Sequence, residues 1–186
     1  MKWVLRVAGA LAGLTILAVG LLAALGARKD SNRLYHAIVL PAPPNEVWPW
    51  LHEPERIKKW VSWVESVEPE SPQPMVGTKS KWVMRDANNN NQRMEIMTLY
   101  REVEPHKRLR VRSSSGDAFE GDASYVLTDL GGGQTRLEAE ARYEMHSWFF
   151  KLLMPIVVPQ AQKKLEMDCE ALKQHMASSK TEYTRN

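Results

Sequence analysis

The chain has 186 residues, 44% of them hydrophobic, which is enough for the core of one domain with an additional segment. Lys2 and Arg6 account for two of its 25 basic residues, which leaves 23 against 22 acidic ones in the rest of the chain. No basic stripe is interleaved with aromatic residues, and this argues against nucleic acid as a partner. The single cysteine, Cys169, excludes intrachain disulfides.

An apolar run near the N-terminus is the first predicted element. Residues 7–27 contain no charge and only one polar side chain, Thr15. A helix of this length spans about 31 Å, which matches the ~30 Å hydrocarbon core of a bilayer. The sequence therefore predicts a transmembrane anchor over residues 1–27, followed by a linker at 28–33.

A cleavable signal peptide is the alternative reading of this run. The small residues Ala24 and Gly26 have the spacing of a cleavage site, but the apolar region is longer than the usual 7–15 residues. Basic residues flank the run on both sides in nearly equal number, and the short cationic N-terminal tail favours export of the C-terminal domain. We therefore expect a single-pass protein whose domain lies on the exported, periplasmic or extracellular side.

The segment 38–63 carries the strongest local signals. An apolar strand runs to Leu40 and meets a cluster of prolines at 41–44, which stop a strand and can begin a helix. Residues 53–55 repeat the start signal, so two short helices in series are predicted, the first interrupted by Pro49. The segment also contains four tryptophans, Trp48, Trp50, Trp60 and Trp63. A tryptophan side chain buries about 150–250 Å², so these four must line a core or a cavity.

Alternating hydrophobicity after this segment predicts an antiparallel sheet. Apolar or small side chains alternate with charged ones over residues 135–145, as in a strand with one buried and one solvated face. Residues 119–127 show the same alternation, and Gly131–Gly133 form the hairpin between the two strands. The other predicted elements of the sheet are strands around residues 81–85, 93–96 and 108–113 and a turn at 88–91.

The spacing of apolar residues becomes helical in the last segment, 148–176. Pro155 and Pro159 should bend or interrupt the beginning of this amphipathic helix, which we expect to lie on the sheet. The polar residues 178–186 show no periodicity and are predicted to be a disordered tail. The core positions of the helix are Ala161, Leu165, Cys169, Leu172 and Met176, and the predicted surface positions are Lys163, Lys164, Glu166, Asp168, Glu170 and Lys173.

Four motifs in the chain are E-V-W at 46–48, P-E-R-I-x-x-W at 54–60, E-V-E-P-H-K-R-L at 102–109 and L-T-D-L-G-G-G-Q-T-R-L at 127–137. Taken in chain order, they resemble the START-like, or SRPBCC, superfamily, which includes polyketide cyclase/dehydrase-like and lipid-transfer domains. The resemblance implies an α+β helix-grip domain over residues 34–177, in which an antiparallel sheet wraps around a long C-terminal helix and encloses a cavity. The superfamily shares an architecture and not one chemistry.

The predicted inward faces show no catalytic constellation. An enzyme needs convergent acid–base, nucleophilic or metal-binding groups, and no two of the five histidines have metal-ligand spacing. We therefore assign no catalytic residue, metal or cofactor. The direction of His36 depends on a strand parity that the sequence leaves open. The histidines are His36, His52, His106, His146 and His175.

Apolar and aromatic side chains dominate the predicted inward face. Small residues such as Ala123, Ala139 and Ala141 leave space beside them, which the terminal helix either fills as ordinary core or leaves as a cavity. Tyrosines can orient a polar head group, and methionines make a wall adaptable to a lipid-like ligand. The candidate ligand-binding residues are Trp82, Met84, Met94, Ile96, Phe119, Tyr125, Tyr143 and Met145.

The sequence thus favours a membrane-tethered domain that binds or carries a hydrophobic small molecule such as a lipid, an isoprenoid or a polyketide-like compound. The alternatives are a cyclase/dehydrase-type enzyme that uses the same cavity and a protein-interaction module whose cavity is filled. Trp148, Phe149 and Phe150 begin a second apolar run and are predicted to contact the membrane interface, where aromatic residues are favoured. Capping of the core is the alternative role for them, and no pattern sets the oligomeric state.

Overall fold

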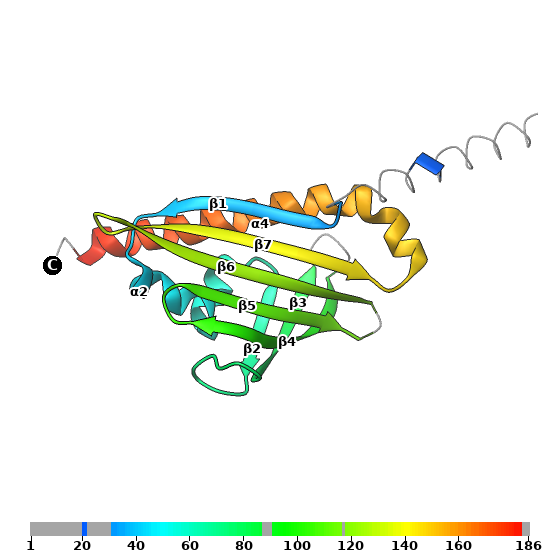
Figure 1. Cartoon of the computed structure of the whole chain (residues 1–186), viewed down its shortest axis with the longest axis horizontal. Coiled ribbons are helices and arrows are strands. Elements are labelled where there is room, and N and C mark those ends of the chain that lie inside the picture. The colour runs from blue at the N-terminus through cyan, green and yellow to red at the C-terminus, as the bar shows by residue number, and fades with distance from the viewer. Residues whose placement is uncertain (1–19, 22–30, 87–90, 117, 184–186) are drawn as a thin grey trace, which may run out of the picture.

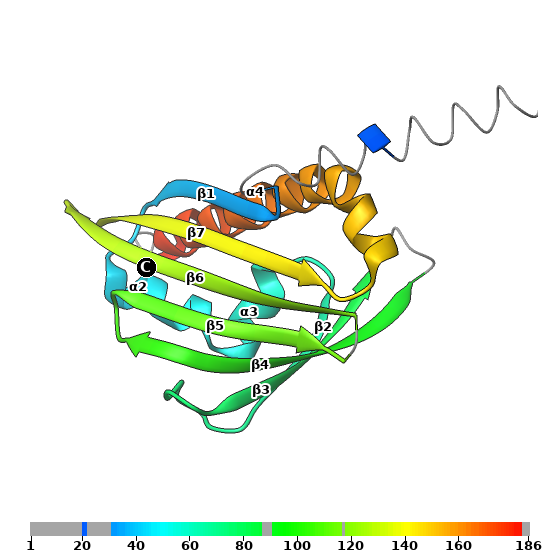
Figure 2. The same ribbon diagram turned by 45° about the vertical axis from the view of Figure 1, so that its right-hand side comes forward.

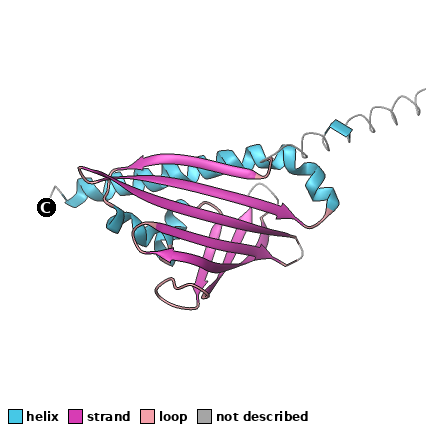
Figure 3. Cartoon of the chain, in the orientation of Figure 1, coloured by secondary structure: helices cyan, strands magenta, loops and turns pink. Residues whose placement is uncertain are grey.

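A seven-stranded antiparallel sheet curves around a long C-terminal helix (Figures 1 and 3). The computed structural model describes residues 20–21, 31–86, 91–116 and 118–183. The strands lie in the order β1-β7-β6-β5-β4-β3-β2, so every pair is formed by consecutive strands except that β1 closes onto β7. The predicted α+β helix-grip class is confirmed.

The elements follow the predicted order along the chain. Pro44 and Pro54 occupy the first positions of α2 and α3, where a missing N–H group costs no hydrogen bond. The two predicted short helices are therefore present, the first of them continued by a 3-10 turn that contains Pro49. The bounds are β1 (Arg33–Leu40), α2 (Pro44–Val47), η1 (Trp48–Leu51), α3 (Pro54–Trp60), β2 (Val64–Pro69), β3 (Lys79–Asp86), β4 (Gln92–Glu104), β5 (Arg108–Ser115), β6 (Phe119–Gly131), β7 (Gln134–Met145) and α4 (Trp148–Tyr183).

Turn chemistry fixes the register of the hairpins. All three glycines at 131–133 have positive φ, which is the conformation that glycine adopts without strain between β6 and β7. Asn91 has φ 55° at the end of the predicted β3–β4 turn, and residues 87–90 lie outside the described part of the chain. The pairing places Phe119 opposite Met145 and Tyr125 opposite Ala139, so the predicted inward residues of β6 and β7 share one face.

The short helices close one end of the domain and carry its densest core. Trp48 and Trp50 are buried there, and the indole N–H of Trp60 donates to the carbonyl of Trp50 at 2.9 Å. Leu137 of β7 and Leu172 of α4 are fully buried in the same cluster. Figure 2 shows α3 on the concave side of the sheet, next to α4.

Helix α4 covers the open edge of β1 as well as the concave face of the sheet. The side-chain amide of Gln162 accepts from the N–H of Tyr35 at 3.0 Å and donates to its carbonyl at 2.9 Å, which satisfies the free edge of the strand. The first turns of α4 stand at an angle to the rest (Figures 1 and 2), and Pro155 and Pro159 lie within the helix. The expected bend is therefore present.

The two ends of the chain differ in how far the structure describes them. Helix α4 continues to Tyr183, so most of the predicted disordered tail is helical; its polar residues include no glycine or proline that would end the helix. The predicted anchor at 1–27 lies outside the described residues apart from Gly20 and Leu21. Within the described ranges, no helix has both the length and the apolar character needed to span a bilayer.

Candidate functional site

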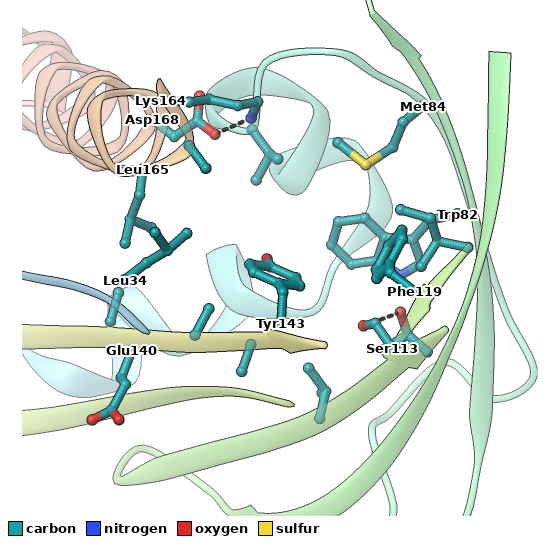
Figure 4. A pocket seen from close by; sticks show the side chains of 18 of the residues that line it. Leu34, Trp82, Met84, Ser113, Phe119, Glu140, Tyr143, Lys164, Leu165 and Asp168 are labelled. Atoms are coloured by element: carbon teal, nitrogen blue, oxygen red, sulfur yellow. Dashed lines mark hydrogen bonds and ion pairs between the residues drawn. The ribbon is translucent and has the colours of Figure 1, made fainter. Parts of the chain in front are cut away.

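A cavity of about 350 Å³ lies between the concave face of the sheet and α4 (Figure 4). Its volume falls within the 300–1,000 Å³ typical of small-molecule sites. The small residues Ala123, Ala139 and Ala141 line it, so the space beside them is not filled by the terminal helix. All eight residues predicted as ligand-binding lie in its wall: Trp82, Met84, Met94, Ile96, Phe119, Tyr125, Tyr143 and Met145.

Strand pairing explains why space remains over β6 and β7. Ala123 pairs with Ala141 and Tyr125 with Ala139, so the facing positions combine small side chains with a single large one. Gly121 has a different role, because a Cβ atom at this position would lie 2.5 Å from Cδ1 of Tyr143. Only glycine therefore lets the Tyr143 ring lie across β6 and point into the cavity.

Two residues of the cavity wall are exposed, one at the start of β4 and one in the first half of α4. Met94 and Val157 are the most exposed residues of its wall, at 36% and 41%. Most other lining residues are buried or half-buried. The wall is therefore apolar at both of the positions where it is most exposed.

The hydroxyl groups of Tyr125 and Tyr143 are candidate hydrogen-bond donors for the polar atom of a ligand. Neither forms a hydrogen bond to another described residue, although both tyrosines line the cavity. Burial raises the pKa of Tyr143, and burial together with the neighbouring Tyr143 raises the pKa of Tyr125. Both are protonated at neutral pH and can donate a hydrogen bond.

Other polar groups of the wall satisfy one another. The hydroxyls of Thr98 and Ser113 lie 3.0 Å apart, and the indole N–H of Trp82 donates to Oγ of Ser80 at 2.7 Å. These pairs let a strand carry polar residues at inward positions without leaving a buried group unsatisfied.

A charged pair at the α4 side of the cavity holds the loop after α3. Nζ of Lys164 lies 2.5 Å from Oδ2 of Asp168, and Oδ1 accepts from the N–H and Oγ–H of Ser62 at 3.1 and 2.7 Å. The ammonium group also lies 4.9 Å from the ring centroid of Trp63, whose backbone has the left-handed φ of 75°. These contacts stabilise an uncommon conformation for tryptophan at the cavity wall.

The placement of Lys164 and Asp168 corrects the prediction that both occupy the outer surface of the helix. Asp168 is 6% exposed, and both residues line the cavity (Figure 4). Their i,i+4 spacing is the signal that could have revealed the pair. It did not show that Ser62, far away in sequence, completes the set of hydrogen bonds.

His36 shares the inward face of β1 with Leu34 and Ile38, which settles its strand parity. Its Nε2 atom is buried without a hydrogen-bond partner among the described residues, yet His36 does not line the cavity. Across the described ranges, no group of three or more His, Cys, Asp or Glu residues is arranged to hold a metal ion. Cys169 is buried in the core, and burial raises its pKa to about 12, so its thiol is unreactive.

The residues predicted to contact a membrane begin α4. Trp148 is 76% exposed, which is the largest exposure among the large hydrophobic residues that the structure describes. The side chains of Phe149 and Phe150 lie outside the described part of the structure. Ile156 and Val157, two turns further along the same helix, are also exposed.

The sequence profile of one protein family matches residues 32–177, most of the chain. The family is described as polyketide cyclase / dehydrase and lipid transport. The chain belongs to this family. No curated protein matches it.

Solved structures with the same fold share little sequence with this member of the polyketide cyclase / dehydrase and lipid transport family. A protein from Thermus thermophilus is 23% identical, with a TM-score of 0.62 over 79% of this chain and 98% of its own. A protein from Nitrosomonas europaea is 19% identical, with a TM-score of 0.63 over 83% and 99%. DynU16, from the dynemicin biosynthetic locus, is 19% identical with a TM-score of 0.58 over 80% of this chain and 48% of its own. These identities establish the fold alone.

Proposed function

We propose that this domain binds or carries a hydrophobic small molecule, such as a lipid, an isoprenoid or a polyketide-like compound, in the cavity between sheet and α4. The observation that carries the proposal is a cavity of about 350 Å³ whose wall is almost entirely apolar and whose most exposed residues are Met94 and Val157. Burial of ~200 Å² of apolar ligand surface contributes about 5 kcal/mol before the costs of immobilisation. Membership of a family described by lipid transport supports the same conclusion.

Titration of residues 28–186 with the uncharged fluorescent probe N-phenyl-1-naphthylamine tests this function. We expect saturable binding at one site, with a blue-shifted emission as the probe leaves water. The matched control is Ala139→Trp, which places an indole in the cavity and should abolish the signal. Probe emission that rises without saturation, or equally in both proteins, would contradict a binding cavity.

We also propose that residues 1–27 anchor the protein in a membrane and that the domain lies on the exported side. The support is the uncharged run at 7–27 and its short cationic tail. Intact mass measurement of the mature protein should give the full chain, whereas loss of a fragment ending near Gly26 would establish a cleaved signal peptide. A reporter fused after Asn186 should be active only outside the cytoplasm.

The start of β1 lies beside the end of β7, which forms part of the cavity wall, and this supports an anchor near the cavity. Arg33 pairs with Arg142 near the end of β7, and Nδ2 of Asn32 donates to the carbonyl of Tyr143 at 3.1 Å. The residues between Ala27 and Arg33 extend to about 20 Å at most. The exposed Trp148 follows β7 directly, so it lies within reach of the same membrane surface.

We propose that Trp148, together with Phe149 and Phe150, contacts the membrane interface and lets a ligand pass between bilayer and cavity. Flotation of residues 28–186 with liposomes should show binding that is lost in Trp148→Ser. Val76→Ser is the control, because Val76 is 64% exposed but lies in the loop between β2 and β3. Equal flotation of all three proteins would remove Trp148 from the membrane surface.

A further inference from the structure

The charge and hydrogen-bonding capacity of the cavity wall restrict the head group of its ligand, given the binding function proposed above. Three charged residues border the cavity: Glu140, Lys164 and Asp168. The carboxylate of Glu140 is directed away from it, because it pairs with Arg33 and Arg142 at 3.0 and 3.2 Å on the solvated face of the sheet. The other two charges therefore decide the electrostatic character of the interior.

Lys164 and Asp168 neutralise each other. The ammonium group of Lys164 lies 2.5 Å from one oxygen of Asp168, and it also forms a cation–π contact with the ring of Trp63. The second oxygen of Asp168 is held by two donors of Ser62. A carboxylate in the cavity would have to share the ammonium group of Lys164 with Asp168 or remain unpaired against an apolar wall, and either costs free energy.

Two hydroxyl donors remain available among the described residues of the wall. Tyr125 and Tyr143 come from neighbouring strands, and neither hydroxyl is used within the described structure. Edge-to-face contacts fix both rings, with centroids 6.5 Å apart for Tyr125 and Trp60 and 5.9 Å apart for Tyr143 and Phe119. A neutral acceptor can therefore meet donors that are already oriented.

We infer that the cavity selects an uncharged amphiphile whose polar group accepts hydrogen bonds, such as a ketone or an ester, over a carboxylate of the same length. The hydroxyl of Tyr125 or of Tyr143 donates to the acceptor, and apolar side chains of the wall such as Trp82 and Met145 surround the chain. The elevated pKa of both tyrosines supports this role, because their hydroxyls keep the proton that they donate.

The test is a competition on the full chain in detergent micelles. Methyl decyl ketone, dodecanoate and dodecane are supplied in equal amounts at about pH 8, where the acid is ionised, and mass spectrometry measures each molecule retained on the protein. We expect at least about tenfold more ketone than dodecanoate. Tyr125→Phe/Tyr143→Phe should reduce ketone retention about fivefold or more, toward that of dodecane, and leave dodecane unchanged.

Two further variants make the test specific. Tyr35→Phe is the matched control, because the hydroxyl of Tyr35 donates to Glu138 at 2.7 Å on the outer face, and it should retain ketone like the wild type. Asp168→Asn keeps an oxygen for Ser62 but releases the charge of Lys164, so dodecanoate retention should rise about tenfold.

The outcomes separate this inference from the binding function. Retention of dodecanoate equal to or above that of the ketone would overturn the inference and leave a hydrophobic binding domain. Unchanged ketone retention in the tyrosine double variant would overturn the assigned donors. Failure to retain any of the three molecules, dodecane included, would overturn both the inference and the proposed function.

Discussion

Filling the cavity with one large side chain should abolish ligand binding without destabilising the domain. Ala139 is 1% exposed and borders the cavity on β7, opposite Tyr125, so Ala139→Trp directs an indole into empty space. The side chain occupies the volume in which a ligand would bury ~200 Å², so about 5 kcal/mol of gross binding free energy is lost. The free energy of unfolding should stay within about 1 kcal/mol of the wild type, because the indole also leaves water.

Leu137→Trp is the matched control for this prediction. Leu137 lies two residues earlier on the same face of β7 and belongs to the same buried cluster as Ala139, but it does not line the cavity. Overpacking there should cost about 1–3 kcal/mol or more. Urea denaturation followed by far-UV circular dichroism compares the two variants. Equal destabilisation by both would show that no empty space lies beside residue 139 and would refute the cavity.

Three other predictions follow from single contacts. Gly121→Ala should lower the free energy of unfolding by more than about 1 kcal/mol in urea denaturation, because its Cβ would contact the Tyr143 ring and the carbonyl oxygen of Arg142. The loss should be smaller when Gly121→Ala is introduced into Tyr143→Ala than into the wild type. Asp168→Ala should cost about 1–3 kcal/mol, measured in the same way, since Ser62 and Lys164 lose their partner; a loss equal to that of an exposed surface variant would contradict this. Burial raises the pKa of Tyr125 above its ordinary value of 10.0, so the folded state keeps a proton that the unfolded state loses, and stability should fall as pH rises above about 10, less steeply in Tyr125→Phe.

Sequence periodicity predicted the wall of the cavity because successive side chains of a strand point to opposite faces of the sheet. The alternation over 119–127 predicted that Tyr125 and Phe119 point inward, as the alternation over 135–145 did for Tyr143, and the pairing of β6 with β7 puts all three on one face. The prolines at 44 and 54 likewise marked the helix starts through their missing N–H groups.

Periodicity failed where a contact joined distant parts of the chain. A helix exposes polar residues by default, so Lys164 and Asp168 were predicted to lie on the surface, and only the loop with Ser62 explains their burial. The role of Gly121 depends on the direction of the Tyr143 ring, which is a matter of packing and not of spacing. The volume enclosed between sheet and α4 is set by the distance between two elements and has no local sequence signal.

The central claim, that the cavity holds a hydrophobic small molecule, is tested most directly by identifying what the protein retains when it is purified from cells. The full chain and its Ala139→Trp variant are extracted in parallel, and mass spectrometry compares the molecules bound to each. We predict an uncharged hydrophobic compound that is enriched at about one per chain in the wild type and absent from the variant. Identical extracts from the two proteins would contradict the claim.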